Sequence, residues 1–478
     1  MRYNILNNFI TRIYAMLPQE RYKKLKEYLS VENPVLLDVI DKYKELDDIG
    51  YKVGLLEDTQ TYTESISWWP MISVLGTFSA GKSTFINEYL GRDIQQSGNQ
   101  AVDDKFTAIC YGNSQEAVVL PGLALDADPR FPFYNISEEV NKVDPGEGGR
   151  VNSYLQLKTL KSPQVKGKIL IDSPGFDADS QRDAILKITS HIVEMSDLVL
   201  IFFDARHPEP GAMRDTLEHL VGTTIKHRDA TKVLYILNQI DTTAKQDNLE
   251  DVMGSWQRAL SQEGLVSGDF YGIYSKKAAE QIDDDALRER LESKRDADLA
   301  KILDRMDKVS IERAYRIVKA LDDFAKDIKE KQLPLLKKEL ESWRSKIVIG
   351  DLVIIALLAA AGVAIHLQYG IWNDLNIAIA GGVGAFVVWL FSHIKISSFL
   401  AQRAAKKYEK VDDNAMAMAI LKNTTFIRSL FGIGKKWYSN TINRIDNLIG
   451  KSKLTIQKLN DQFVSPSGAM KQESNQGN

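Results

Sequence analysis

Cysteine is nearly absent from this chain, because Cys110 is the only one among 478 residues. A single thiol cannot form an intramolecular disulfide, so the sequence excludes a disulfide-stabilised scaffold and suits a reducing compartment. Cys110 stands in the apolar run TAICY, and we therefore interpret it as a buried structural thiol rather than a reactive one.

The chain also lacks an excess of charge of one sign, since its formal net charge is −3. A charge this close to zero provides no global field for nucleic acid, and we expect no nucleic-acid partner. The N-terminus is a poor signal peptide, because Asn7 and Arg12 interrupt its apolar stretch. Phe9, Ile13 and Leu17 recur every four residues there, which predicts an amphipathic helix.

The chain is too long for one core, and its character changes along its length. From 70 to 275, short apolar runs alternate with helical stretches, which is typical of buried parallel strands with helices on both faces. The predicted strands are MISVL (71–75), TAICY (107–111), KILID (168–172), LVLIFF (198–203), KVLYIL (232–237) and FYGIY (270–274). This pattern predicts an α/β nucleotide-binding domain.

Charged helical sequence follows the predicted sheet. Apolar residues there step by three or four in two series, which predicts the seam of long packed helices. The series are Ile317, Leu321, Phe324, Ile328 and Leu336, Leu340, Trp343, Ile347. Pro334 lies between them and predicts a kink or junction. The residues from Val464 onward, with their Ser, Gly, Gln and Asn, predict a disordered tail.

The segment GTFSAGKST (76–84) follows one predicted strand and opens a predicted helix, as a phosphate-binding P-loop requires. We expect backbone N–H groups of this loop to surround the phosphates, and the nucleotide-binding residues to be Gly76, Ser79, Ala80, Gly81, Lys82, Ser83 and Thr84. Lys82 is predicted to reach the β- and γ-phosphate oxygens, and the Ser83 hydroxyl to coordinate Mg²⁺. The alternative is a chance match in a Gly/Ser-rich turn.

The segment DSPG (172–175) ends another predicted strand. Its Asp172 is predicted to lie beside the metal, generally through water. The Gly175 N–H is predicted to meet the γ-phosphate, so that loss of this phosphate releases the following segment. A DxxG motif is a weak signal alone, and it gains weight because a P-loop precedes it.

The segment NQID (238–241) follows the strand KVLYIL. Asn238 and Asp241 are predicted to select the base, because an Asp aimed at the N1–H and amine of guanine discriminates against adenine. Gln239 replaces the usual Lys at this motif, which predicts reduced base affinity. Ser275 and Lys276 follow the strand FYGIY and are candidates for the last base-contacting loop. An ordinary strand-end turn is the alternative interpretation.

Together these motifs resemble the dynamin superfamily of membrane-remodelling GTPases, in particular its bacterial dynamin-like, mitofusin-like and EH-domain-containing branches. The resemblance covers about residues 66–276 and rests on Ser79, the DSPG motif and the long insert between Lys82 and Asp172, which supplies additional strands. DKFTAICYG (104–112) and DLVLIFFDARHPEPG (197–211) also look like segments of the EH-domain relatives. The resemblance implies GTP and Mg²⁺ as cofactors, and catalytic roles for Lys82, Ser79, Asp172 and Gly175.

The chain departs from this family in two places. Phe78 stands where dynamin has a Gln that orients the attacking water, which predicts slow hydrolysis or use of a backbone group. A switch I threonine is not evident, because Val102 and Asp103 fall at its place and Thr107 is expected in the strand. The EH-domain relatives bind ATP with a similar base motif, so ATP remains an alternative to GTP.

Two apolar runs, 347–367 and 375–394, are each long enough to cross a bilayer, since about 20 residues match a hydrocarbon layer of about 30 Å. Asp351 is their only formal charge, and the short linker 368–374 has no Lys or Arg. Basic residues flank the pair on both sides, which predicts a hairpin with both ends in the cytoplasm. Shallow insertion as a paddle and a buried core hairpin are the alternatives.

We therefore predict an α/β P-loop GTPase domain, with a mostly parallel sheet and helices on both faces, plus an all-α helical-bundle stalk with a membrane-inserting hairpin. The predicted segments are N-terminal helices packing with the stalk (1–66), the GTPase domain (67–280), a first stalk segment (281–346), the hairpin (347–394), a second stalk segment (395–463) and the disordered tail (464–478). The expected location is a membrane, the bacterial inner membrane, with the GTPase domain in the cytoplasm.

The predicted function is a membrane-anchored dynamin-like GTPase that couples GTP binding and hydrolysis to self-association and membrane remodelling. Its expected partners are the lipid bilayer, through 347–394, and other copies of the chain, through the GTPase domain and stalk. One alternative is a nucleotide-binding membrane scaffold with very slow hydrolysis, and another is an ATP-using EH-domain-like relative. An ATP-driven transporter is disfavoured, because the chain has no LSGGQ-type signature.

Overall fold

The computed structural model describes residues 18–463 except 33, 59, 78, 97–104, 129–130, 132, 135, 176–182, 207–229, 263–267, 278, 280–281, 412 and 433. The chain divides into two compact units, of which one is Ile66–Arg316 and the other combines the residues before and after it. The predicted N-terminal amphipathic helix, with Phe9, Ile13 and Leu17, lies outside the described residues, and so does the predicted tail 464–478.

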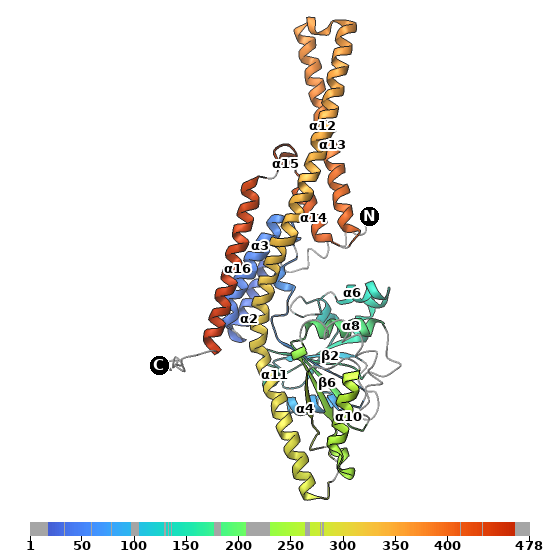
Figure 1. Ribbon diagram of the computed structural model, residues 1–478, viewed down its shortest axis with the longest axis vertical. Coiled ribbons are helices and arrows are strands. Elements are labelled where there is room, and N and C mark those ends of the chain that lie inside the picture. The colour runs from blue at the N-terminus through green and yellow to red at the C-terminus, as the bar shows by residue number, and fades with distance from the viewer. Residues whose placement is uncertain are drawn as a thin grey trace. The chain divides into compact units, whose positions relative to one another are not determined.

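The unit Ile66–Arg316 is built on an eight-stranded sheet of order β3-β4-β2-β5-β1-β6-β7-β8 (Figure 1). The strands are β1 (Met71–Gly76), β2 (Phe106–Tyr111), β3 (Val118–Pro121), β4 (Leu155–Leu160), β5 (Ile169–Asp172), β6 (Leu198–Asp204), β7 (Val233–Asn238) and β8 (Asp269–Gly272). The pairs β2–β5 and β3–β4 are antiparallel, and the other neighbours are parallel. The mostly parallel sheet is therefore confirmed, and β3 and β4 come from the long insert.

Helices cover both faces of this sheet, as successive residues of β6 show. The helices of this unit are α4 (Lys82–Leu90), α5 (Leu123–Asp126), α6 (Ile136–Val143), α7 (Val151–Tyr154), α8 (Asp183–Met195), α10 (Leu249–Gln262) and the beginning of α11 (Asp285–Asp327). Phe202 packs in a cluster with Phe85 of α4 and Met306 of α11. Its neighbour Phe203 points to the opposite face and packs with Trp256 of α10. A strand buried on both faces must be apolar throughout, which explains the run LVLIFF.

The second unit is helical in its described residues. It contains α2 (Pro18–Glu32), α3 (Leu37–Val53), the end of α11, α12 (Leu333–Tyr369), α13 (Leu375–Glu409), α14 (Asn414–Asn423), α15 (Phe426–Phe431) and α16 (Lys435–Phe463). The predicted seam residues are buried in it, apart from Phe324, which is half-buried. Segments far apart in sequence meet here: the Tyr43 hydroxyl donates to the Ile317 carbonyl at 2.9 Å, and the Asn423 amide to the Val53 carbonyl at 2.7 Å.

A π-helical turn, Ile328–Gln332, joins α11 to α12 directly before Pro334. Proline has no N–H for the helical hydrogen bond, and its ring crowds the preceding turn. A turn with wider hydrogen bonding accommodates such a position without ending the helix. The predicted junction at Pro334 is therefore a π turn between two long helices.

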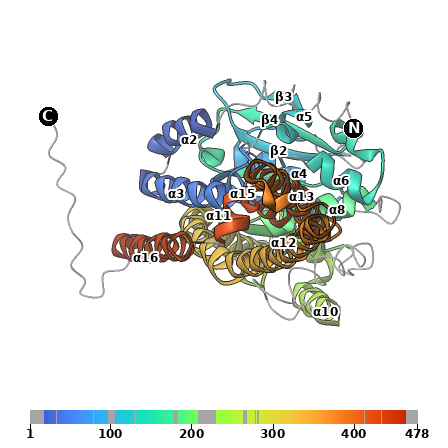
Figure 2. The same cartoon turned by 90° about the horizontal axis from the view of Figure 1, so that it is seen from above.

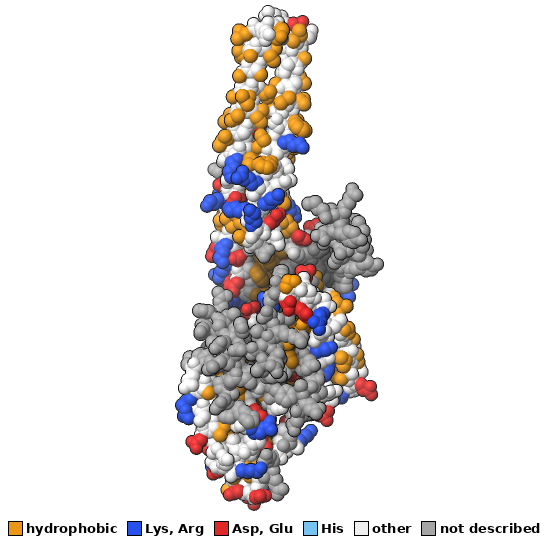
Figure 3. Space-filling model, turned by 90° about the vertical axis from the view of Figure 1, so that its right-hand side faces the viewer, with side chains coloured by type: hydrophobic (Ala, Val, Ile, Leu, Met, Phe, Trp, Pro, Cys, Tyr) orange, Lys and Arg blue, Asp and Glu red, His pale blue; other side chains and the backbone are white. Residues whose placement is uncertain are grey.

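The helices α12 and α13 form the hairpin, and they lie side by side in both ribbon views (Figures 1 and 2). Gly370 ends α12 with a left-handed φ of 62°, and the Asp374 carboxylate caps α13 by accepting the Asn376 N–H at 2.9 Å. Only 6% of the most apolar window of each helix is buried. In Figure 3 hydrophobic side chains cover the visible face of this hairpin, and Lys and Arg side chains gather at its base. The hairpin is therefore not the buried core of its unit.

Candidate functional site

The P-loop connects the end of β1 at Gly76 to the start of α4 at Lys82. Two of its glycines are required by close approaches. A Cβ on Gly76 would lie 2.5 Å from the Phe202 carbonyl oxygen, and one on Gly81, whose φ is +84°, would lie 2.2 Å from the Asn238 amide nitrogen. Ser79 also has a positive φ of 60°, which is uncommon for a residue with a side chain. The loop therefore has the strained, compact form in which backbone N–H groups can surround an anion.

Lys82 lies at the first turn of α4 and is buried. Its ammonium donates to the carbonyls of Gly76 at 3.1 Å and Thr77 at 3.2 Å, so the cation lies against its own loop. Ser83 and Thr84 follow in the same turn, where the free N–H groups of the helix and its dipole favour negative charge. The structure thus brings all the predicted phosphate-binding residues to one helix N-terminus.

Asp172 is the last residue of β5 and is buried. Strand register places it opposite Val74 of β1, two residues before Gly76. Its carboxylate accepts a hydrogen bond from the Gln95 amide, and Gln95 in turn accepts one from the Lys158 ammonium. Sequence reasoning missed Gln95 and Lys158, because no local motif marks them and Lys158 belongs to the unpredicted strand β4. Gly175 is the last described residue before 176–182.

The predicted base loop is tied directly to the P-loop. The Asn238 amide donates to the Ala80 carbonyl at 2.8 Å, and the Gln239 amide donates to the Ser79 carbonyl at 2.7 Å. Gln239 has a left-handed φ of 64°, and after it the short helix Ile240–Gln246 begins, with Asp241 buried in its first turn. Gln239, which the sequence marked only as a departure, therefore joins the two loops.

Ser275 and Lys276 differ in their surroundings. Ser275 donates to Glu88 of α4, and it lines a small pocket together with Thr84 and Asn238. Lys276 instead forms ion pairs with two carboxylates of α11, Asp296 at 3.2 Å and Glu292 at 3.3 Å. The hydrogen bond that its ammonium donates to Asp296 raises the pKa of Lys276. The structure thus brings Ser275 to the P-loop and holds the Lys276 ammonium on α11.

The protein oxygen donors at this site suit magnesium only if phosphate oxygens and water supply further ligands. Within the described ranges, no three or more His, Cys, Asp or Glu side chains are grouped so that they could hold a metal ion. The predicted ligands Ser83 and Asp172 are both oxygen donors. Mg²⁺ usually keeps several waters and binds through one or two carboxylates plus substrate phosphates. A hydroxyl and a carboxylate beside a phosphate-binding loop fit this coordination preference.

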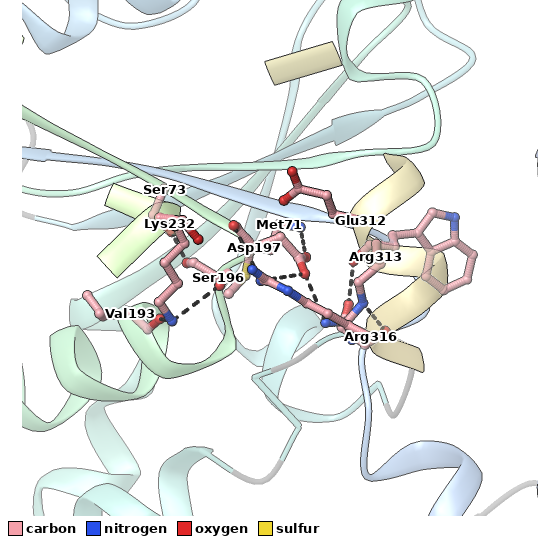
Figure 4. A network of polar contacts seen from close by, with 12 residues as sticks. Met71, Ser73, Val193, Ser196, Asp197, Lys232, Glu312, Arg313 and Arg316 are labelled. Carbon is pink, nitrogen blue, oxygen red and sulfur yellow. Dashed lines mark hydrogen bonds and ion pairs between the residues drawn. The ribbon is translucent and has the colours of Figure 1, made fainter. Parts of the chain in front are cut away.

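A buried polar network fixes α11 to the opposite end of the sheet (Figure 4). Asp197, just before β6, accepts the Met71 N–H at 2.9 Å and the guanidinium groups of Arg313 and Arg316, each at 3.2 Å. Arg313 also donates to the Ser67 carbonyl at 2.8 Å. Within this unit, α11 is therefore anchored where β1 and β6 begin. Nothing in the sequence motifs pointed to this network.

Several predictions concern residues outside the described ranges. They are the effect of Phe78, the place of the switch I threonine at Val102 and Asp103, and the segment that Gly175 would release. Thr107 is described and lies in β2, as expected, where its hydroxyl accepts the Gln156 amide at 2.7 Å.

Part of the chain is similar to known proteins. Residues 72–240 match the Dynamin family. EH domain-containing protein 2 of Homo sapiens is 26% identical over 222 residues, which cover 44% of this chain and 37% of that protein. EH domain-containing protein 1 of Bos taurus is 26% identical over 184 residues, which cover 37% and 32%. The chain thus spans about a third of the length of these relatives.

A distant structural match is to a chain of an oligomerised bacterial dynamin pair, which is described as providing a mechanism for the long range sensing and tethering of membranes. The match covers 92% of this chain and 78% of that chain, with 14% sequence identity and a TM-score of 0.36.

Proposed function

We propose that this chain, whose residues 72–240 match the Dynamin family, is a membrane-anchored GTPase in which GTP binding and hydrolysis drive self-association and membrane remodelling. One observation carries this proposal. The P-loop, Asp172 and the Asn238 loop lie together at the carboxyl ends of β1, β5 and β7, in a chain that also has two apolar hairpin helices with only 6% of their most apolar windows buried.

The proposed nucleotide site assigns a task to each predicted residue. Backbone N–H groups from Gly76 to Thr84 bind the phosphates, and the Lys82 ammonium exchanges its loop carbonyls for phosphate oxygens. Ser83 and Asp172 would hold Mg²⁺ directly or through water, and the ion would neutralise charge on these oxygens. The Gly175 N–H senses the γ-phosphate, and Ser79 is the candidate for contact with the transferring group.

Base selection is assigned to Asp241, with Asn238 and Ser275 shaping the pocket beside the P-loop. The carboxylate of Asp241 accepts two hydrogen bonds from guanine, whereas adenine would leave it facing a like acceptor. The ties from Asn238 to Ala80 and from Gln239 to Ser79 hold the base and phosphate elements in a fixed relation. We therefore propose GTP rather than ATP as the substrate.

The membrane anchor is assigned to 347–394. The exposed apolar side chains of this hairpin would meet water in a soluble protein, whereas lipid removes that cost at roughly 25 cal/mol per Å². Cations outside the apolar segments, at Arg344, Arg403 and Lys406, support a topology with both ends on the cytoplasmic side. We propose that the hairpin spans the bilayer, and that the basic residues of α13 contact anionic head groups.

Helix α11 is the proposed route of coupling. Its Arg295 lines the pocket and donates to the Tyr274 carbonyl at 3.1 Å, while Arg313 and Arg316 fix it to Asp197. A change at the nucleotide pocket therefore acts on a helix that is already held at a second point of the same sheet. Since α11 continues covalently into the second unit, this helix is the simplest means of passing the nucleotide state to the stalk.

The decisive experiment measures GTP and ATP turnover by purified full-length chain, with and without vesicles, together with vesicle flotation. We expect flotation with the vesicles, preference for GTP, and faster phosphate release when lipid is present. Lys82→Ala is expected to remove turnover while leaving flotation intact. The control Lys308→Ala, on the exposed face of α11 and paired with Asp304, is expected to keep both.

Each alternative gives its own result. Binding of GTP without lipid-stimulated turnover would identify the slow scaffold, and preference for ATP would identify an EH-domain-like nucleotide choice. A chain that stays in the aqueous phase would contradict the membrane anchor. A chain that remains monomeric with a GTP analogue and vesicles would contradict self-association.

A further inference from the structure

We propose that α15 (Phe426–Phe431) is a second membrane-contacting element, which lies in the interfacial layer of the bilayer beside the base of the hairpin. Its partner is phospholipid, and its contact lies outside the predicted segment 347–394. The inference rests on the proposed insertion of the hairpin and adds to it a site that no motif in the sequence marked.

The helix α15 is short but presents large apolar side chains to the outside. Phe431 is 80% exposed, Ile427 69% and Phe426 44%. Scattered exposed apolar residues need no explanation, whereas a cluster on one short helix marks a contact surface. Among the described residues of this unit, neighbouring elements leave Phe431 and Ile427 mostly exposed, so these side chains are open to a partner from outside that part of the chain.

Contacts with both hairpin helices hold α15 at the base of the hairpin. The Ser429 hydroxyl lies 2.8 Å from Nε2 of His393 on α13, and Nδ1 of His393 lies 2.8 Å from the Asp351 carboxylate on α12. The Arg344 guanidinium of α12 also donates to the Leu430 carbonyl at 3.0 Å. The helix α15 is thus fixed to both α12 and α13 rather than hanging from a loop.

This cluster has the connectivity of a Ser-His-Asp triad, but it does not present a nucleophile. Ser429 is 1% exposed, and its hydroxyl also contacts the Phe426 carbonyl at 2.6 Å. The ring of Phe426 packs edge-on against His393, with centroids 5.4 Å apart. The polar cluster therefore orients α15, and the apolar side chains that it leaves outside are the functional part.

The depth of these contacts matches the membrane interface. Arg344 precedes the apolar segment and Asp351 lies just inside it, and this stretch of helix rises about 10 Å at 1.5 Å per residue. Interfacial helices bury their apolar face about 5–10 Å into the boundary between head groups and acyl chains. Because the Leu430 carbonyl of α15 accepts the Arg344 guanidinium at one end of this stretch, and Ser429 reaches Asp351 at the other end through His393, α15 lies at the level of the boundary when the hairpin is inserted.

Charge and area favour lipid over a second copy of the chain. Cations accompany the apolar side chains: Arg428 lies over the Trp437 ring at 4.8 Å, and Lys395 over the Phe391 ring at 5.4 Å. Figure 3 shows Lys and Arg side chains at the base of the hairpin. Phenylalanine buries at most about 250 Å², so three partly exposed side chains fall short of the roughly 800 Å² per partner of a stable protein interface.

The test uses the full chain in vesicles and takes advantage of its single cysteine. On a Cys110→Ser background, one cysteine is introduced at Phe431, at Ile427, at Leu357 of the hairpin or at Leu454 of α16, and is labelled with an environment-sensitive fluorophore. Leu454 is the matched control, because it is an exposed apolar residue of the same unit on another helix. Vesicles contain phospholipids brominated at shallow or deep acyl positions, which quench a nearby fluorophore.

We expect the emission of labels at Phe431 and Ile427 to shift to the blue and to be quenched mainly by shallow bromines. The label at Leu357 is expected to be quenched mainly by deep bromines. The label at Leu454 is expected to remain unquenched. If the label at Leu357 is quenched but the labels at Phe431 and Ile427 are not, the membrane anchor stands and this inference is overturned. A blue shift at α15 without lipid quenching would also overturn it, because a protein partner then covers the helix. If the label at Leu357 is not quenched either, the proposed membrane anchor is overturned together with the inference.

Discussion

Replacing Asp197 with Ala provides a quantitative test of the network that fixes α11. The carboxylate is fully buried and is shared by the Met71 N–H and by Arg313 and Arg316. Removing one partner of a buried ion pair leaves the other charge uncompensated, which costs about 3–5 kcal/mol. We therefore expect the free energy of opening of the unit Ile66–Arg316 to fall by about that amount.

Asp197→Asn separates charge from shape. The amide oxygen still accepts one hydrogen bond, but charge-assisted bonds of about 1.5–3 kcal/mol become neutral ones of about 1 kcal/mol. The expected loss is therefore about 1–2 kcal/mol, between wild type and Ala. Asp304→Asn is the control, since Asp304 and Lys308 form an ion pair on α11, the helix that carries Arg313 and Arg316, and both side chains are 59% exposed. Such a pair contributes less than about 1 kcal/mol.

Hydrogen exchange read by mass spectrometry suits this test, because a chain of two units does not unfold in one step and peptides report each unit separately. For amides of β1 and α11 that exchange only by unfolding of their unit, a loss of 3–5 kcal/mol accelerates exchange by about 10²–10⁴-fold. Exchange in Asp197→Ala within about threefold of wild type would refute the reasoning. Equal effects of Asp197→Asn and Asp304→Asn would refute it too.

Three further predictions concern single residues. Gly81→Ala is expected to weaken GTP binding by at least about tenfold in a titration, because the residue has a left-handed φ and a close neighbour. The control Gly254→Ala, inside α10 where a Cβ would meet only the Arg258 guanidinium in ordinary contact at 3.7 Å, should leave binding unchanged and gain about 0.5–1 kcal/mol in stability. Gln239→Leu removes the hydrogen bond to the Ser79 carbonyl and is expected to weaken GTP binding about fivefold in the same assay. An unchanged affinity would contradict a role for this hydrogen bond in binding. Burial pushes the pKa of Glu339 upward, but hydrogen bonds from the Lys407 ammonium and the Tyr408 hydroxyl, with the positive charge nearby, together outweigh it and the net pKa is lowered. This carboxylate therefore stabilises the fold above its ordinary pKa of 4.5 and ceases to do so as the pH falls through the lowered value. Glu339→Gln should therefore make the unfolding temperature fall less steeply as the pH is lowered into the acid range. The same pH dependence in this variant and in the wild type would contradict the prediction.

The sequence predicted those regions of the fold that leave a local pattern. Strands buried on both faces read as continuous apolar runs, and each predicted run has a strand in the structure. The edge strand β3 was not predicted separately, because it is short and all four of its residues are exposed. In β4 polar residues interrupt the apolar run, and one of them, Lys158, is buried and donates to Gln95 beside the candidate site.

The candidate site was predictable where chemistry is local and not where it depends on distant segments. Spacing alone locates Gly76, Gly81 and Lys82, because a P-loop is one continuous turn. The contact from Lys158 through Gln95 to Asp172 joins three elements that are far apart in sequence. No period or motif encodes such a contact, since it arises only when the sheet has formed.

The turn at the tip of the hairpin bears on how the protein enters a bilayer. Its backbone groups are largely satisfied within the turn: the Gly370 N–H donates to the His366 carbonyl at 2.7 Å, and Asp374 caps α13. The ring of His366 stacks on Trp372 at 4.3 Å, and the turn has a single formal charge. In the proposed topology this tip is the leading end that traverses the hydrocarbon layer. Few bare polar groups then travel with it, so both helices can insert as one preformed unit, with the indole of Trp372 settling among the head groups of the far leaflet.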